Sequence, residues 1–399
     1  MDHCTAGLDW ASEAHAICIV DPQGTIGESF TVAHDAAGLA ELVRRLRRYP
    51  ELRLAIERPD GLLVDTLIDA GIVVVPIHPN KLKAARDRYT TSGAKCDPGD
   101  AYVLADVLRT DGHRFRELQP LSEATRALRA LVRSRDDLVK AKVALTNQLA
   151  AQLAVFWPGA AEIFYRLDSA IALAFLTRYP TPEAAASLGE RRLGAFLRRT
   201  AYSGRKPVAV LLAKLDAAPT GRVGPVESEA RGNCVKALVR ALGVLLPQIS
   251  ELEGSIAVAL DLHPDGPLIK SFPRAGEVNA AQILAEVGDV RERFPSDDVL
   301  AMEGGIVPVT KRSGKMKSVS FRWACNKRLR RALTTWANNS RRASPWAQDI
   351  YQRAVDRGAD HPHAVRILAR AWLRVLWRCW QDRVPYDPAS HLGAARFAA

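Results

Sequence analysis

The stretch GLDWASEAHAICIVDPQGTIGESFTV, residues 7 to 32, decides the fold. It holds short apolar runs that are separated by turn-forming residues, ASE at 11–13 and DPQG at 21–24. Runs of this length, broken in this way, are typical of strands joined by tight turns. We therefore expect an antiparallel meander of three strands over residues 6–10, 14–20 and 26–32.

Further strands and helices extend this meander. Residues 35–49 carry Leu39, Leu42 and Leu46 at helical spacing, which predicts a helix. The next elements are expected as a strand at 52–57, a helix at 61–70, a fully buried strand at 72–77 and a further helix. Three antiparallel strands followed by βα units form the plan of the ribonuclease-H-like sheet. The sequence therefore predicts an α/β domain over residues 1–120 whose first and fourth strands are central neighbours.

The rest of the chain is predicted to be mostly helical. Residues 121–156 contain recurring apolar positions without Gly or Pro, so they predict one long helix. This helix is either a coiled-coil arm for a partner helix or a long helix inside one domain. We place a helical middle region at 121–262, with a loop at 217–232, and a smaller, mostly α-helical domain at 263–399. The segment 272–278 resembles the start of a helix-hairpin-helix.

The charge of the chain indicates a polyanionic partner. Its net charge is +12 and its pI is about 9.6, and phosphate backbones are bound largely by Lys and Arg. The charge is concentrated in residues 304–348, the basic segment, which has eleven Lys or Arg and no Asp or Glu. Trp323 and Trp336 lie there. We expect both in the core, and stacking on unpaired bases is the alternative.

Several classes of protein are disfavoured. The six cysteines are far apart and form no C-x-x-C pair, which argues against a zinc site. We find no run of about eighteen uncharged apolar residues that would cross a membrane. The N-terminus has no basic region followed by an apolar one, so no secretory signal is expected. The cytoplasm is the default location.

Four acids are predicted to converge. Asp9 lies in the first strand, Glu57 ends the fourth, and Asp97 and Asp100 begin a helix, where a spacing of three places them on one face. Carboxylates brought together in a partly dehydrated cleft repel one another and need cations. Ligands with oxygen atoms only select Mg²⁺ or Mn²⁺, and a pair of such ions is the usual device for cleaving a phosphodiester.

Each acid also has an ordinary explanation. Asp97 before Pro98 fits a helix N-cap, and Asp100 suits the helix dipole. Asp9 fits the end of a strand, and Glu57 fits a surface ion pair with Arg58. The four together, in the right fold order, favour the metal site.

The motifs resemble one family. The chain is similar, over nearly its whole length, to the DEDD-type transposases of the insertion-sequence one-ten family, relatives of the Piv-type DNA invertases. The resemblance rests on GLDWASEAHAICIVDPQG, LAIERPDG, SGAKCDPGDAYVLADVLR, FPRAGEVNAAQILAEVGDVRERFPS, GGIVPVTKRSGK and CNKRLRRAL, in that order.

This resemblance implies an architecture and a mechanism. It implies a RuvC-like N-terminal domain in which Asp9, Glu57, Asp97 and Asp100 bind the metal, then a coiled-coil arm and a C-terminal transposase domain. Ser313 matches the family's nucleophilic serine. The partners implied are donor and target DNA, a structured bridge RNA that guides both, and further copies of the chain in a dimer or tetramer.

Residues around Ser313 suit attack on a phosphate. A serine hydroxyl is a poor nucleophile unless its surroundings stabilise the alkoxide. Cationic side chains can do this and also neutralise the phosphate. The cations expected to contact nucleic acid are Lys311, Arg312, Lys315, Lys317, Arg322, Lys327 and Arg328. Ser318 and Ser320 compete for the role, and a flexible binding turn is the ordinary alternative. Gly314 favours Ser313, because it permits close approach of the backbone to a phosphate.

Two rival functions stay open. An ATP-binding phosphotransferase would share the sheet and its Gly-x-Asp hairpin, but it needs a second copy of the domain, and no second meander follows residue 110. A RuvC-like Holliday-junction endonuclease, or a DNA invertase without an RNA guide, would use the same acids.

Overall fold

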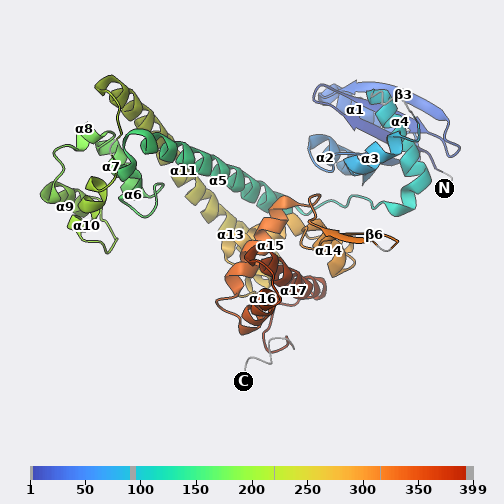
Figure 1. Ribbon diagram of the computed structural model, residues 1–399. Helices are drawn as coiled ribbons and strands as arrows, with labels where there is room; N and C mark the ends of the chain where they lie inside the picture. The colour runs from blue at the N-terminus through green and yellow to red at the C-terminus, as the bar shows by residue number, and fades with distance from the viewer. Residues whose placement is uncertain (1–2, 90–95, 220, 315, 392–399) are drawn as a thin grey trace. The chain divides into compact units, whose positions relative to one another are not determined.

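The computed structural model describes residues 3–89, 96–219, 221–314 and 316–391 (Figure 1). The chain divides into two compact units. The first consists of residues up to 122 together with 290–295, and the second of residues 123–289 and those from 296 onward. The division into three domains at 120 and 262 stays a prediction.

A five-stranded sheet forms the centre of the first unit, in the order β3-β2-β1-β4-β5. The pairs β1–β2 and β2–β3 are antiparallel, and β4 is parallel to both β1 and β5. The predicted meander and the central position of the first and fourth strands are confirmed, and this arrangement is consistent with a ribonuclease-H-like start of the chain. The strands are β1 Thr5–Trp10, β2 Ala14–Val20, β3 Ile26–Ala33, β4 Arg53–Ile56 and β5 Val73–Pro76.

Helices cover both faces of this sheet. On one face, α1 and α2 bury leucines such as Leu42 and Leu67 against Leu8 and Ile17. On the other, α3 and α4 pack on Ala55 and Val75. Asp35 caps α1, where its side chain accepts a hydrogen bond from the backbone of Gly38. The helical elements are α1 Ala36–Leu46, α2 Leu62–Asp69, α3 Pro79–Arg86, α4 Asp97–Asp111, and the 3₁₀ turns η1 Gly112–Arg114 and η2 Arg291–Arg293.

Helix α4 lies directly on the backbone of β1 at Gly7. A Cβ atom on Gly7 would lie 2.0 Å from the carbonyl oxygen of Ala101 and 2.5 Å from the nitrogen of Ala105. Two residues earlier, Thr5 Oγ1 donates a hydrogen bond of 2.9 Å to the carbonyl of Ala105. Only glycine fits at position 7, because any side chain would push the helix off the strand.

Gly7→Ala is expected to lower the free energy of unfolding by about 1–3 kcal/mol, the usual cost of overpacking. Gly27→Ala in β3 is the matched control, since the nearest atom to its added Cβ is 3.8 Å away. We expect the control to change stability by less than about 0.5 kcal/mol. Calorimetry, with hydrogen exchange of β1 and α4, measures both. Equal effects of the two substitutions would contradict the close contact.

The second unit is built on two long helices, α5 Glu123–Phe156 and α11 Pro225–Leu262, which lie side by side (Figure 1). They are antiparallel, because Thr125 contacts His263 at one end while Leu153 shares a core with Val239 at the other. The predicted long helix is confirmed. Its ordered partner is another helix of the same chain, and a coiled-coil partner from a second chain stays a prediction.

Helix α11 corrects one expectation, the extent of the loop before it. It begins at Pro225, so the second half of the loop predicted at 217–232 is helical. Within the described ranges, it is also the one helix that is long and apolar enough to cross a membrane, with a mean hydropathy of 1.2 over 18 residues. The 18-residue window itself is only 17% buried, while Val235, Val239 and Leu242 of α11 pack among neighbouring helices. A single helix of this kind is weak evidence for a membrane span.

Smaller elements surround the two ends of this helix pair. One cluster consists of α6 Pro158–Glu162, α7 Ala170–Arg178, α8 Pro182–Ala185, α9 Glu190–Arg199 and α10 Val208–Asp216. The other consists of α12 Gly266–Lys270, α13 Glu277–Val287, α14 Asp297–Glu303, the hairpin strands β6 Val309–Ser313 and β7 Met316–Ser320, α15 Lys327–Ser340, α16 Pro345–Asp356 and α17 His361–Asp382. The hairpin was not predicted. The turn before α13 was, and Gly276 there has φ of 67°.

Candidate functional site

The backbone brings Asp9 and Glu57 to one edge of the sheet. β1 and β4 are parallel, and their last paired residues are Leu8 and Ile56. Asp9 follows Leu8 and Glu57 follows Ile56, and both acids are partly buried. Because side chains alternate along a strand, Asp9 lies on the same face as Gly7, the face that α4 covers. The two acids therefore lie at the ends of neighbouring central strands, and the approach of their side chains stays a prediction.

The other two acids begin α4. Asp97 is its first residue and is exposed, whereas Asp100 is only 3% exposed. The N-cap is Cys96, whose carbonyl accepts the first helical hydrogen bond from Asp100 at 2.9 Å. The ordinary explanation of Asp97 as the N-cap is therefore wrong, because Asp97 already lies inside the helix.

Arg86 holds Asp100 from the end of α3. Its Nε donates to Oδ1 at 2.5 Å and its Nη2 to Oδ2 at 2.6 Å. A buried carboxylate is costly without such a partner, so this bidentate pair accounts for the burial. The sequence gives no signal for the pairing, because the two residues are fourteen positions apart on different helices. Both oxygens of Asp100 face a cation of the protein itself.

The four side chains do not yet form a metal cluster. Among the described residues, no three His, Cys, Asp or Glu side chains lie close enough together to hold a metal ion. The donor chemistry nevertheless fits Mg²⁺ or Mn²⁺, since Asp9, Glu57 and Asp97 offer only oxygen ligands. Convergence of the four acids around a metal stays a prediction.

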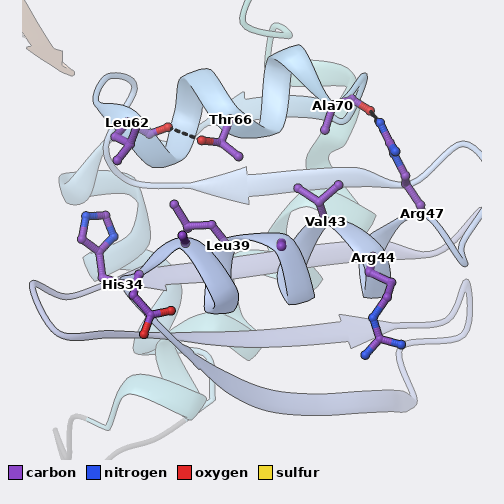
Figure 2. Close-up of a pocket in the computed structure, with 11 residues that line it drawn as sticks. His34, Leu39, Val43, Arg44, Arg47, Leu62, Thr66 and Ala70 are labelled. Atoms are coloured by element: carbon purple, nitrogen blue, oxygen red, sulfur yellow. Dashed lines mark hydrogen bonds between the residues drawn. The ribbon is translucent and has the colours of Figure 1, made fainter.

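A groove of about 800 Å³ lies on the opposite side of the sheet, between α1 and α2 (Figure 2). Leu39, Val43 and Leu62 give it an apolar lining, and Arg47 bridges the two helices by donating to the carbonyl of Ala70. The acids face α4 instead. The groove therefore does not belong to the acidic site.

Ser313 is the last residue of β6, at the tip of the basic hairpin. Gly314 follows it with φ of 54°, a conformation that favours glycine, and Ser313 pairs across the hairpin with Met316. The side chain of Ser313 is exposed. Ser318 is opposite Lys311, and Ser320 Oγ contacts the carbonyl of Val309 at 3.4 Å.

The cations predicted to contact nucleic acid differ in their surroundings. Lys311, Arg312 and Lys327 are exposed. Arg322 donates to the carbonyl of Val307 at 3.3 Å, and Arg328 forms ion pairs that hold two helices together. Lys315 and the side chain of Lys317 lie outside the described residues.

Comparisons with known proteins match both parts of the chain. A family model described as "Transposase" covers residues 6–158, which include all four acids. A second, described as "Transposase IS116/IS110/IS902 family", covers residues 266–352, which include the hairpin. The chain belongs to the IS110 family of transposases. The family resemblance seen in the sequence is confirmed.

Two relatives show how far the similarity extends. The "mini-circle putative transposase for IS117" of Streptomyces coelicolor is 33% identical over 96% of this chain and 94% of its own length. An "uncharacterized 42 kDa protein" of insertion element IS900 from Mycobacterium paratuberculosis is 30% identical over 98% of both chains. The similarity therefore extends over the sheet, the long helices and the C-terminal region alike.

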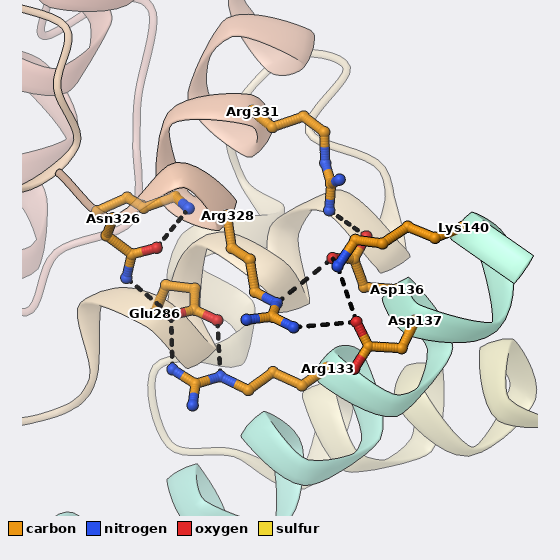
Figure 3. Close-up of polar contacts among 9 residues, drawn as sticks. Arg133, Asp136, Asp137, Lys140, Glu286, Asn326, Arg328 and Arg331 are labelled. Atoms are coloured by element: carbon orange, nitrogen blue, oxygen red, sulfur yellow. Dashed lines mark hydrogen bonds and ion pairs between the residues drawn. The ribbon is translucent and has the colours of Figure 1, made fainter. Parts of the chain in front are cut away.

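Ion pairs join the basic segment of this transposase to its long helix α5 (Figure 3). Asp136 is 3% exposed and forms ion pairs with Arg328 and Arg331 of α15. The Nζ of Lys140 lies 3.4 Å from its Oδ2. Asp137 beside it accepts from Arg328 at 3.1 Å. The partners are almost two hundred positions apart in sequence, so sequence patterns did not reveal them.

A second buried acid, Glu286 of α13, fixes the start of α15. It is 1% exposed, and Arg133 donates to its two oxygens at 3.1 and 3.0 Å. Asn326, the N-cap of α15, donates to Glu286 Oε2 at 2.8 Å. Burial alone would raise the pKa of Glu286, but the hydrogen bonds from Arg133 and Asn326 and the nearby arginines outweigh it and lower the pKa.

Glu286→Gln is expected to lower the free energy of unfolding at pH 7 by about 1.5–3 kcal/mol, the worth of hydrogen bonds to a charged group. Because the folded pKa is lowered, the advantage of the wild type is present above the ordinary pKa of 4.5 and disappears as the pH falls through the folded value. Urea unfolding followed by tryptophan fluorescence reports on the second unit, since Trp10 is the only tryptophan before residue 123.

The matched control is Glu253→Gln. Glu253 pairs with Arg135 between the long helices, but its side chain is 37% exposed. We expect the control to cost less than about 1 kcal/mol, as exposed ion pairs do. A loss from Glu286→Gln that persists unchanged at pH 3 would contradict the stated role of its charge.

Proposed function

We propose that the chain is a DNA recombinase that cleaves and exchanges strands during transposition of an insertion sequence. Asp9, Glu57, Asp97 and Asp100 form its metal-binding site, and Ser313 is its nucleophile. The observation that carries the proposal is the parallel register of β1 and β4, which leaves Asp9 and Glu57 adjacent on the face covered by α4. Membership of the transposase family supports it.

Asp9, Glu57 and Asp97 would hold Mg²⁺ or Mn²⁺. Such an ion supplies Lewis-acid chemistry at a phosphodiester and offsets the repulsion of the carboxylates. Asp100 has both oxygens on Arg86, so it can join the ligands only where that pair opens. With the pair closed, Asp100 acts on the site through the position of α4.

Ser313 would form the covalent link to DNA. As its Oγ bonds to phosphorus, the bond between phosphorus and one sugar oxygen breaks, and the proton that the serine gives up ends on that oxygen, which leaves as a DNA hydroxyl. Attack on the phosphoserine by a DNA hydroxyl then reseals a strand and restores the serine, so no external energy source is needed. The exposed cations of β6, Lys311 and Arg312, lie beside Ser313 and would stabilise the charge on the phosphate.

We extend the proposal to a guide RNA and to assembly as a dimer or tetramer, both of which rest on the family alone. If base pairing reads the sequence of the target, the protein needs contacts to the backbone and to helix shape. RNA that copurifies with the protein, and is required for cleavage, would distinguish this from an invertase without a guide. The alternative of a RuvC-like Holliday-junction endonuclease predicts cleavage without a covalent intermediate.

The acids are tested by Asp9→Asn, Glu57→Gln and Asp97→Asn, one at a time. Each is expected to abolish strand cleavage and to leave DNA affinity within about threefold, because binding depends on cations rather than on these carboxylates. Cleavage of a labelled duplex in Mg²⁺ and a filter-binding assay measure the two effects. The control is Asp65→Asn in α2, an exposed acid of the other face. Full activity after any of the three changes would remove that residue from the site.

The nucleophile is tested by trapping. Wild-type protein is expected to form a protein–DNA adduct on denaturing gels, and Ser313→Ala is expected to form none. Ser318→Ala and Ser320→Ala, in the same hairpin, are the controls and are expected to keep the adduct. If the adduct persists in Ser313→Ala and is lost in a control, the nucleophile is that other serine. Cleavage without any adduct would favour the endonuclease.

A further inference from the structure

Trp323 is exposed in the basic segment, where the sequence predicted burial. Its exposed fraction is 74%, whereas Trp336 in the same segment is 1% exposed and donates from Nε1 to the carbonyl of Pro273. The prediction that Trp336 is buried is confirmed, and the same prediction for Trp323 is wrong. A tryptophan is a large apolar side chain that normally finds cover, so one left open on a charged surface indicates a ligand.

The backbone that presents Trp323 is held in place. Phe321, two residues before it, meets the indole edge-on with ring centres 5.0 Å apart. The guanidinium of Arg330 lies 4.6 Å from the Phe321 ring, and that of Arg366 lies 5.2 Å from it. Arg330 also donates to the carbonyl of Arg322 at 2.9 Å. These contacts hold residues 321–323 in place, so the Trp323 ring does not depend on a ligand for its position.

The segment that carries the ring is cationic. Trp323 is the third residue after the end of β7, and residues 304–348 contain no acid. Lys311, Arg312 and Lys327 are exposed in this segment, and among the described residues none forms an ion pair or a side-chain hydrogen bond with them. A protein partner that covered the ring would have to neutralise these charges. A nucleic-acid strand does so with its own phosphates while it offers a flat base to the ring.

We propose that Trp323 stacks on an unpaired base of a nucleic-acid strand whose phosphates contact the basic hairpin. The arrangement joins the two parts of a single-strand site, an aromatic face for the base and cations for the backbone. Stacking is tolerant of sequence, because every base has a π-face. The inference takes nucleic acid as the ligand from the proposed function, but it requires neither the metal nor the serine.

Binding of labelled oligo(dT) and of a blunt duplex of equal length, measured by fluorescence anisotropy without Mg²⁺, tests the proposal. Trp323→Ala is expected to weaken binding of the single strand by roughly 5- to 100-fold, the usual effect of removing one stacking residue. Duplex affinity is expected to stay within about twofold. The slope of affinity against salt is expected to stay the same, because no charge is removed. Trp323→Phe keeps an aromatic ring and is expected to recover most of the single-strand affinity.

The matched control is Tyr165→Ala, which removes an aromatic that is fully exposed outside the basic segment and is expected to leave both affinities unchanged. Equal losses on single strand and duplex, or no loss from Trp323→Ala, would overturn the proposal. A smaller mass in solution for Trp323→Ala than for the wild type, measured by light scattering, would also overturn it. That result would mean that a second copy of the chain covers the ring. Strand cleavage by the acid and serine variants is measured separately. If Asp9→Asn abolishes cleavage but Trp323→Ala does not change single-strand affinity, stacking alone is refuted. If Asp9→Asn cleaves normally but Trp323→Ala weakens single-strand binding, only the proposed function is refuted.

Discussion

The first unit depends on the contact between α4 and the bare backbone at Gly7. The helix can approach β1 this closely only because position 7 has no side chain. This approach sets the height of the whole helix above the sheet, and therefore the place of its first turn, which carries Asp97 and Asp100. The parallel pairing of β1 with β4 sets the other two acids in the same way. Backbone geometry, more than any side-chain contact, therefore sets where Asp9, Glu57 and the first turn of α4 lie on the sheet.

The basic segment divides its charges between structure and surface. Arg328 and Arg331 meet Asp136 of α5, and Arg330 supports the segment that follows the hairpin. Such buried pairs are costly to break, so they fix the position of α15. The exposed cations include Lys311 and Arg312 on β6, Lys327 at the start of α15 and Arg342 after its end. Some of the cations that contribute to the net charge of +12 are therefore engaged in ion pairs within the protein and are not available to a polyanion.

Much of the fold could be predicted from the sequence, because its signals are local. Apolar alternation and turn residues located the strands, and helical spacing located α5. The hairpin β6–β7 was missed because its residues are polar and exposed, without the apolar alternation of a strand. The partners Arg86 and Glu286 were missed because their contacts join different helices, which no local pattern in the sequence relates. Trp323 was assigned to the core because composition cannot tell an open tryptophan from a buried one.

The antiparallel pairing of α5 and α11 has a consequence for how such chains can diverge. The pair is tied at one end by Thr125 and His263 and at the other by the core that contains Leu153 and Val239. Adding residues to one helix alone would break the match at one of these ties, or force a bulge. Insertions or deletions here must come in pairs of equal length, one in each helix. Arm length among relatives is therefore expected to vary in steps of whole turns, with both helices changing together.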